Sequence, residues 1–293
     1  MQKKWIIKED DFETVKKFSA ELGVTELTAK ILLHREITEV EDAKKFLNPE
    51  DAPFYNPFEM LGMRDAVDRI IIAIEGGEKI CVYGDYDVDG MSASAILTRT
   101  LKKLGANVEN YIPARSEGYG LNIPALEKIS AGGATLLITV DCGISNISEI
   151  NLLKGFNVDT IITDHHSTDG EIPKAYAIIN PQVEGAIKED TKVDDILSLS
   201  YNSGSNVAYK LAMALLKDID DDKLKDELLI ISSCGMIADI VPLIGENRSM
   251  ASVCLELLNN KKEESSKPIY RLLEKREEKR EESGGITHEV RLL

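Results

Sequence analysis

The chain has 293 residues, and 43% of them are hydrophobic, which suits a folded protein with one large domain or two modest ones. Its 51 acidic and 35 basic residues give a formal net charge of −16. A charge of this sign disfavours non-specific binding to nucleic acid, unless a local basic path or bound metal ions offset the acids.

Four cysteines lie far apart in apolar surroundings and form no CxxC pair. This pattern predicts reduced, buried thiols and a cytoplasmic protein. No apolar run reaches the length of a signal peptide or a membrane span, so we expect no membrane partner. The cysteines are Cys81, Cys142, Cys234 and Cys254.

Residues 1–60 are predicted to form an N-terminal helical cap without chemistry of its own. Apolar residues recur there at helical spacing in three segments, and a stretch with several prolines follows the third. The predicted helices cover residues 11–18, 24–33 and 40–47.

From residue 61 to residue 258, short apolar strands first alternate with helices. The strands are apolar throughout and not only at every second residue, which is typical of a parallel sheet covered on both faces. We therefore predict an α/β fold with a doubly wound, mostly parallel five-stranded sheet, helices on both faces, and further helical segments towards both termini. The predicted strands are residues 80–83, 108–112, 135–140, 158–163 and 176–179.

Helices are predicted between these strands and after the last of them. From residue 259 to residue 293 apolar residues thin out, and we expect a charged, solvated tail that begins a truncated linker or second domain. The predicted helices are residues 65–74, 92–104, 123–129, 146–153, 205–217, 224–238 and 252–258.

Acidic and imidazole side chains follow three of the predicted strands. Taken one at a time they have ordinary explanations, such as an acidic turn, a helix cap or a pair of surface histidines. Because the carboxyl ends of parallel strands line one crevice, their convergence predicts a metal site instead. The residues are Asp85, Asp87 and Asp89 after the first strand, Asp141 after the third, and Asp164, His165 and His166 after the fourth.

The types of ligand indicate which metals this site would bind. Carboxylates with one or two imidazoles and no thiolate suit Mn²⁺ or Mg²⁺ better than structural zinc. The acids, with Asp239 as a further candidate, exceed the needs of one ion, so we predict two ions bridged by Asp87 or Asp141. Two such ions suit the in-line attack of an activated water on phosphorus.

With these residues in place, the chain resembles the DHH phosphoesterase superfamily, and most closely its RecJ-type single-strand-specific 5′→3′ exonucleases. The resemblance runs from about residue 20 to about residue 258 and rests on six motifs in order. They are GDYDVDG at 84–90, EGYGLN at 117–122, DCGIS at 141–145, DHH at 164–166, SGSNVAYKL at 203–211 and GMIADIVPLIGENR at 235–248.

The resemblance implies roles for the same residues. Asp85 would be a ligand or an acid behind the ligands, and Asp164 would orient a histidine or a metal-bound water. His166 would lie beside the scissile phosphate as a ligand or a donor, so that His166, Asp164 and Asp87 form the catalytic set. The implied metal ligands are Asp87, Asp89, Asp141, His165 and Asp239.

The implied activity is metal-dependent hydrolysis of single-stranded DNA from the 5′ end to mononucleotides, in DNA repair and recombination. Two alternatives stay open: hydrolysis of short oligoribonucleotides, cyclic dinucleotides or pyrophosphate, and a metal-binding scaffold with poor activity. Members of this group usually continue into a second domain with a GGH-type motif, which is not recognisable before Leu293. We therefore expect a catalytic core whose grip on the substrate comes from a missing domain or a partner subunit.

A few residues of the core are candidates for substrate contact. Arg115 and Arg248 could bind phosphate, although solvated loop arginines are an equally good explanation. Tyr119 could stack on a base or pack within its loop. Ser203 and Ser205 lie at the predicted start of a helix whose backbone N–H groups could receive a phosphate.

Overall fold

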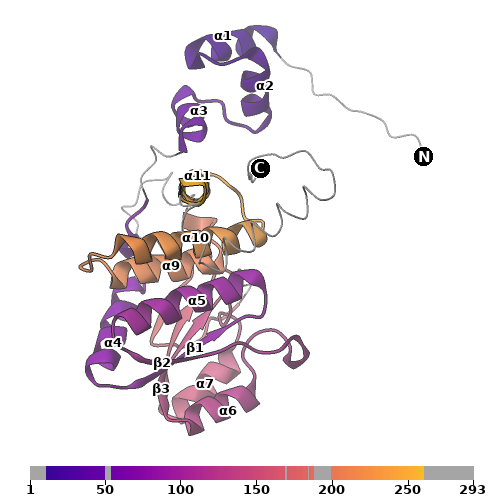
Figure 1. Cartoon of the computed structure of the whole chain (residues 1–293). Coiled ribbons are helices and arrows are strands. Elements are labelled where there is room, and N and C mark those ends of the chain that lie inside the picture. Colours follow the sequence, from indigo (N-terminus) through magenta and orange to yellow (C-terminus); the bar gives the residue numbers. More distant parts are fainter. Residues whose placement is uncertain (1–10, 50–53, 169, 184, 188–198, 261–293) are drawn as a thin grey trace, which may run out of the picture. The chain divides into compact units, whose positions relative to one another are not determined.

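The computed structural model describes residues 11–49, 54–168, 170–183, 185–187 and 199–260. The described residues fall into two compact units, one within residues 1–53 and the other within residues 54–293 (Figure 1). The charged run at residues 275–283 lies outside the described residues. The predicted domain limits at residues 60 and 258 stay predictions.

The described residues of the first unit, 11–49, form three short helices, as the periodicity predicts. They are α1 (Phe12–Leu22), α2 (Glu26–His34) and α3 (Val40–Leu47). The side chains of Asp11 and Thr25 cap the first two helices by accepting backbone hydrogen bonds. The apolar faces of all three helices meet in one small core, which contains Val15, Phe18, Ala29, Leu32 and Ala43.

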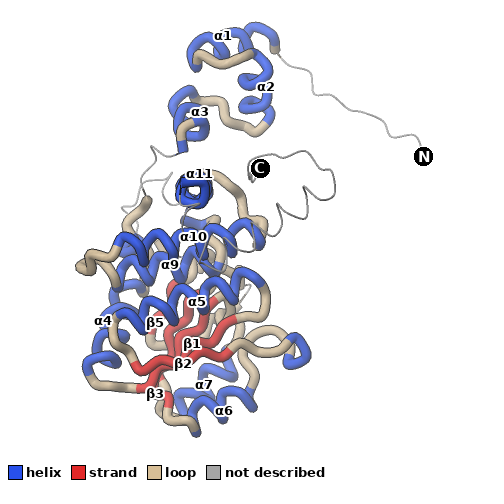
Figure 2. Tube along the Cα trace, in the orientation of Figure 1, coloured by secondary structure: helices blue, strands red, loops and turns tan. Residues whose placement is uncertain are grey.

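The second unit is built on a five-stranded parallel sheet, which confirms the predicted α/β fold (Figure 2). The strand order is β2-β1-β3-β4-β5, so the direction of winding reverses between β1 and β3. The strands are β1 (Lys79–Gly84), β2 (Asn107–Tyr111), β3 (Ala134–Val140), β4 (Asp159–Thr163) and β5 (Ala177–Ile179).

Helices cover both faces of this sheet. On β1, Ile80 and Val82 pack into the larger core with α4, α5 and α9, whereas Cys81 and Tyr83 pack into the smaller core with α6 and α7. Both faces are therefore buried, which explains why the strands are apolar at every position. The helices are α4 (Met63–Glu75), α5 (Val88–Lys103), α6 (Ile123–Ala131), α7 (Ile147–Gly155), α9 (Gly204–Leu215), α10 (Asp222–Ala238) and α11 (Gly245–Asn260), with short 3₁₀ turns η2 (Pro57–Glu59) and η3 (Arg115–Glu117).

Helices α5 and α11 begin a full turn or more before their predicted starts. Helix α5 starts at Val88 and not at residue 92, because Asp87 caps it and Gly90 is tolerated in its first turn. Helix α11 starts at Gly245 and not at residue 252, because its first turns bury the polar residues Glu246 and Asn247, which the apolar periodicity does not register.

The four cysteines are free thiols, and Cys81, Cys142 and Cys254 are buried as predicted. Cys234 is only partly buried, which corrects the prediction for that residue. Among the described helices, none combines the length and the apolar character that a membrane span requires.

Candidate metal centre

Three strands of the sheet end at the same level, and an aspartate follows each of them. Gly84 of β1 pairs with Val140 of β3, which in turn pairs with Thr163 of β4. This edge includes the point between β1 and β3 where the winding reverses, and parallel sheets open a ligand crevice at such a point. The residues that follow the three strand ends are Asp85, Asp141 and Asp164.

The start of α5 shapes the acidic segment after β1. Asp87 accepts a hydrogen bond from the backbone N–H of Gly90 at 2.8 Å and so caps the helix. Asp89 consequently lies in the first helical turn, where the helix dipole favours a negative charge. Gly90 lets this turn approach Asp85 closely, because a Cβ atom at residue 90 would lie 2.7 Å from the Asp85 backbone.

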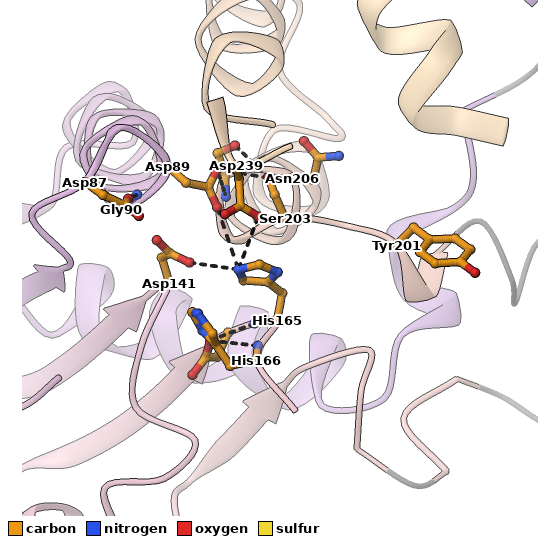
Figure 3. A network of polar contacts seen from close by, with 12 residues as sticks. Asp87, Asp89, Gly90, Asp141, His165, His166, Tyr201, Ser203, Asn206 and Asp239 are labelled. Atoms are coloured by element: carbon orange, nitrogen blue, oxygen red, sulfur yellow. Dashed lines mark hydrogen bonds and ion pairs between the residues drawn. The ribbon is translucent and has the colours of Figure 1, made fainter. Parts of the chain in front are cut away.

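His165 lies between three carboxyl groups (Figure 3). Its Nε2 atom is 3.1 Å from Oδ1 of Asp141, 3.7 Å from Oδ2 of Asp239 and 4.0 Å from Oδ2 of Asp89. These carboxyl groups come from the end of β3, the end of α10 and the first turn of α5. The tertiary fold therefore assembles this cluster from segments that are distant in the sequence.

Several buried ligand atoms in the cluster have no hydrogen-bond partner among the described residues. They are Oδ1 of Asp85, Oδ2 of Asp89, Oδ1 of Asp141 and Nε2 of His165. Although Nε2 of His165 faces Oδ1 of Asp141 at 3.1 Å, the two are not aligned as a hydrogen bond. Unpaired buried polar atoms are costly and rare. A convergent set of carboxylate oxygens and an imidazole nitrogen fits a hard divalent cation.

The electrostatics of the carboxyl groups lead to the same cation. Burial, together with the neighbouring carboxylates of Asp89 and Asp87, raises the pKa of Asp141 to about 10. Burial also raises the pKa of Asp85 and of Asp239. A nearby divalent cation would favour the charged form of each group and reverse these shifts.

Asp164 holds the two histidines in place. Its buried carboxylate accepts hydrogen bonds from the backbone N–H groups of Ile144, His165 and His166 at 2.9, 2.7 and 3.2 Å. The same carboxylate binds Nδ1 of His166 at 2.7 Å, and this hydrogen bond raises the pKa of His166. Asn180 donates to the His166 carbonyl at 3.0 Å. Asp164 thus lies where a residue that orients a histidine is expected.

Two glycines allow α9 and α10 to approach the carboxyl groups closely. A Cβ atom on Gly204, at the start of α9, would lie 2.4 Å from Oδ1 of Asp141. A Cβ atom on Gly235, in the last turn of α10, would lie 2.8 Å from Oδ1 of Asp89. A larger residue at position 204 would therefore displace the Asp141 carboxyl group. A larger residue at position 235 would press on both Asp89 and Ser205, whose hydroxyl oxygen would lie 2.5 Å from the new Cβ.

The candidate ligands form three overlapping groups, and within each group the ligand atoms lie within 4.8 Å of one another. Asp141 and His165 each belong to two of the groups, and Asp87 belongs to one. Of the two predicted bridging residues, the geometry favours Asp141. The groups are Asp85, Asp87 and Asp141; Asp89, His165 and Asp239; and Asp141, His165 and His166.

Two predicted substrate contacts lie beside the cluster. The guanidinium of Arg115 stacks over the ring of Tyr86 at 5.2 Å, and Tyr86 lies between two of the acids after β1. The hydroxyl of Tyr119 is 3.1 Å from Nδ1 of His166, and this tyrosine is 55% exposed. Their contacts with a phosphate and a base stay predictions.

The other predicted substrate contacts have different surroundings. Ser203 and Ser205 are fully buried, and the Ser203 hydroxyl and the Ser205 backbone N–H donate to Oδ1 of Asp89 at 2.9 and 3.1 Å. In the structure both serines therefore orient Asp89. Arg248 is partly buried in the first turn of α11. Phosphate binding by these three residues stays a prediction.

The sequence reasoning missed several buried polar residues that organise the cluster. Asn206 and Ser232 lie behind the two serines, and Asn180 supports the histidines. Asn206 carries only a weak signal: it is a polar residue near the start of a largely apolar helix, and buried polar residues are the informative exceptions in a core, but the same helix also contains Ser205 and Lys210. Asn180 follows a strand and resembles an ordinary turn residue, so the sequence offers no comparable signal.

Comparison with known proteins shows where these features recur. The family described as the DHH family, N-terminal domain, matches residues 79–236. The single-stranded-DNA-specific exonuclease RecJ of Bacillus subtilis is 41% identical over 270 residues, which cover 92% of this chain and 33% of that protein. The RecJ of Thermus thermophilus is 36% identical over 191 residues, covering 64% of this chain and 26% of that protein.

Solved structures of RecJ share the fold. Exonuclease RecJ bound to manganese matches with a TM-score of 0.61 and 33% identity, over 70% of this chain and 50% of that chain. RecJ from Thermus thermophilus in complex with Mn²⁺ matches with a TM-score of 0.66 and 27% identity, over 86% of this chain and 34% of that chain. The chain spans about a third of the length of the curated relatives it matches.

Proposed function

Because the chain belongs to the DHH family, we propose that it is a metal-dependent phosphodiesterase that hydrolyses single-stranded DNA from the 5′ end to mononucleotides, in DNA repair and recombination. Its relatives are single-stranded-DNA-specific exonucleases, and solved RecJ structures hold Mn²⁺ or Mg²⁺. The observation that supports the proposal is the convergence of four unpaired, buried ligand atoms at the carboxyl edge of the sheet.

The proposed cofactor is a pair of Mn²⁺ or Mg²⁺ ions. Asp85 and Asp87 would hold one ion, Asp89, His165 and Asp239 the other, and Asp141 both. When bound, such ions lower the pKa of a water molecule and offset negative charge on a phosphate. The chain's own contribution is to hold the acids close together, on three strand ends and two helix ends, although their negative charges repel one another unless cations offset them.

The groups beside the ligands suit a phosphodiester substrate. Asp164 fixes the ring of His166 and raises its pKa, so the imidazole keeps a proton to higher pH and can donate it to a phosphate oxygen. The Tyr119 hydroxyl borders the same ring. Arg115 is held over Tyr86 beside the acids and offers a planar cation to a second phosphate.

The test is to remove one candidate ligand without removing the helix cap that it also provides. Asp87→Asn keeps a side-chain oxygen that can cap α5, but it removes the charge. We expect hydrolysis of a single-stranded oligonucleotide in Mn²⁺ to fall at least about 100-fold, with an unchanged melting temperature. As a control, Asp221→Ala removes the cap of α10, away from the cluster, and should lower stability but keep activity. Full activity in Asp87→Asn would exclude the proposed role of this residue.

The direction of hydrolysis is tested with oligonucleotides labelled at one end. A 5′ label should appear at once in mononucleotides, whereas a 3′ label should stay in progressively shorter strands. Dinucleotides and oligoribonucleotides assayed in parallel test the alternative substrates. Binding of Mn²⁺ without hydrolysis of any of these would instead support a metal-binding scaffold.

A further inference from the structure

A buried layer of polar side chains lies directly behind Asp89. Oδ1 of Asp89 accepts hydrogen bonds from the Ser203 hydroxyl at 2.9 Å and from the Ser205 backbone N–H at 3.1 Å. The two serine hydroxyls are 3.0 Å apart. One oxygen of Asp89 is thereby fixed, and the other, Oδ2, stays available on the side of His165. The orientation of this carboxylate consequently depends on the position of the start of α9.

A second layer ties the start of α9 to α10 and α11. The Ser205 hydroxyl donates to the Ser232 carbonyl at 3.0 Å, and the Ser232 hydroxyl donates to Oδ1 of Asn206 at 3.0 Å. Nδ2 of Asn206 donates to Oδ1 of Asn247 at 2.7 Å. All four of these residues are fully buried. Three helices are therefore joined by one continuous, buried set of hydrogen bonds.

The same set of hydrogen bonds reaches the segment that follows Asp239. Nδ2 of Asn247 donates to the carbonyls of Tyr201 at 2.8 Å and Pro242 at 3.1 Å. Pro242 lies three residues after Asp239, and the intervening turn contains Ile240 at a φ of 62°. A β-branched residue in this left-handed conformation is strained and needs support from its surroundings. Asn247 provides a part of that support.

Asn206 suits the central position in this arrangement because an amide accepts at one end and donates at the other. A carboxylate or an apolar side chain of similar size would fail at one bond or at both. The donor and acceptor of each bond are also fixed, because the Ser232 hydroxyl donates to Asn206 and Oδ1 of Asn247 accepts from it. The requirement for asparagine here is therefore chemical and does not arise from packing volume alone.

We propose that Asn206, with Ser232 and Asn247, is a positioning residue for the ion held by Asp89, His165 and Asp239. The inference rests on the proposed function, because it assumes that these residues bind a divalent cation. It goes further by separating the two subsites. The second subsite, with Asp85 and Asp87, receives no bond from this set among the described residues. Loss of the Asn206 amide should weaken the binding of one ion and leave the binding of the other unchanged.

The experiment measures Mn²⁺ binding to the full chain without substrate. Calorimetric titration and electron paramagnetic resonance are applied to the wild type, Asn206→Asp and Ser232→Ala. We expect both variants to bind one Mn²⁺ as the wild type does and the other about 10- to 100-fold more weakly. At Mn²⁺ concentrations that saturate the wild type, the signal of an exchange-coupled pair should be replaced by that of a single Mn²⁺. Excess Mn²⁺ should restore the coupled signal.

Ser233→Ala is the matched control. Ser233 is a fully buried neighbour of Ser232 on α10, and its hydroxyl donates to the Met250 carbonyl on α11 at 3.2 Å, outside the set that leads to Asp89. It should lower the melting temperature of the metal-free chain as Ser232→Ala does but leave the Mn²⁺ titration unchanged. Ser232→Ala removes a single oxygen, so it keeps the test decisive if Asn206→Asp does not fold.

Two outcomes would overturn the inference, and they can be told apart. If the variants bind both ions as the wild type does and only melt earlier, the polar set is structural, and the proposed function is unaffected. If the wild type itself binds no Mn²⁺, the proposed function fails together with this inference.

Discussion

Asp141 combines three properties that rarely occur together in one residue. Its φ is 59°, its side chain is buried, and its carboxyl group belongs to two of the three candidate ligand groups. Aspartate is among the few non-glycine residues that tolerate the left-handed conformation. This conformation turns the chain sharply after β3 and directs the carboxyl group to His165 at 3.1 Å. The strained backbone and the raised pKa of Asp141 both persist because the surrounding strands and helices hold the residue in place.

The stability of the metal-free chain should fall as the pH rises from about 5 to about 8. The folded state holds a proton on Asp141, whose pKa is raised to about 10 from the model-peptide value of 3.8. The unfolded chain releases this proton near its ordinary pKa. The free energy of unfolding therefore decreases as the pH rises, because proton release favours the unfolded state. The raised pKa values of Asp85, Asp239 and His166 act in the same direction. Melting temperatures in the presence of a chelator measure the effect.

Bound Mn²⁺ should reverse this dependence, because the ion binds the deprotonated carboxylates and competes with protons. The rise in melting temperature on adding Mn²⁺ should therefore be larger at the higher pH. As a control, Asp141→Asn should flatten the metal-free slope and lose most of the stabilisation by Mn²⁺. A metal-free chain that becomes more stable over this pH range would contradict the assignment of buried, protonated acids.

At the level of secondary structure, the ends of two helices define the site. The first turn of α5 carries Asp89, and the start of α9 brings the backbone N–H of Ser205 to the same carboxylate. The two helices also pack against each other along their length. Gly204 permits this approach because it has no side chain, and the space that a Cβ atom would need is occupied by Asp141. Its φ is not in the left-handed region. The absence of a side chain, and not backbone freedom, is what this position requires.

Gly204→Ala should weaken metal binding with little loss of stability. Alanine is favoured over glycine in a helix by up to about 1 kcal/mol, which offsets part of the strain. The added Cβ would lie 2.4 Å from Oδ1 of Asp141, so the carboxyl group must move. We expect Mn²⁺ affinity to fall at least about tenfold, measured by calorimetry. Gly155→Ala, at the end of α7 with no atom within 4 Å of the new Cβ, is the matched control.

The strands and the acids that follow them were predictable from the sequence. Buried parallel strands are apolar at every position, and each of these apolar runs ends at a short segment that contains an acid. The start of α5 was not predictable, because the sequence around Asp87 and Asp89 is typical of a loop. Only the hydrogen bond from Gly90 to Asp87 shows that the helix begins there. The role of Asn206 was also out of reach. Its partners Ser232 and Asn247 are distant in the sequence, and only the packing of three helices brings them together.

At the scale of the whole sheet, the two edges differ in how their charged residues are compensated. The carboxyl edge gathers acids whose negative charges, once the acids are deprotonated, cost stability without cations. The amino edge carries a compensated ion cluster: Arg69 donates to Asp159 at 2.7 Å and to the two carboxylate oxygens of Glu78 at 3.2 and 2.8 Å. Thr135 donates to the same Glu78 at 2.6 Å. The cluster joins α4 to the starts of β1, β3 and β4.

Arg69→Ala should therefore lower stability without changing metal affinity. The Arg69 side chain is nearly buried, and its loss leaves two acids without their cation, whereas partial exposure of Glu78 and Asp159 moderates the cost. We expect the free energy of unfolding to fall by about 2–3 kcal/mol in denaturant titrations. Arg99→Ala, which removes the more exposed pair with Glu227, should cost less than about 1 kcal/mol. If Arg69→Ala weakened Mn²⁺ binding in the fully folded chain, the two edges of the sheet would be coupled, and the separation of stability from chemistry would be wrong.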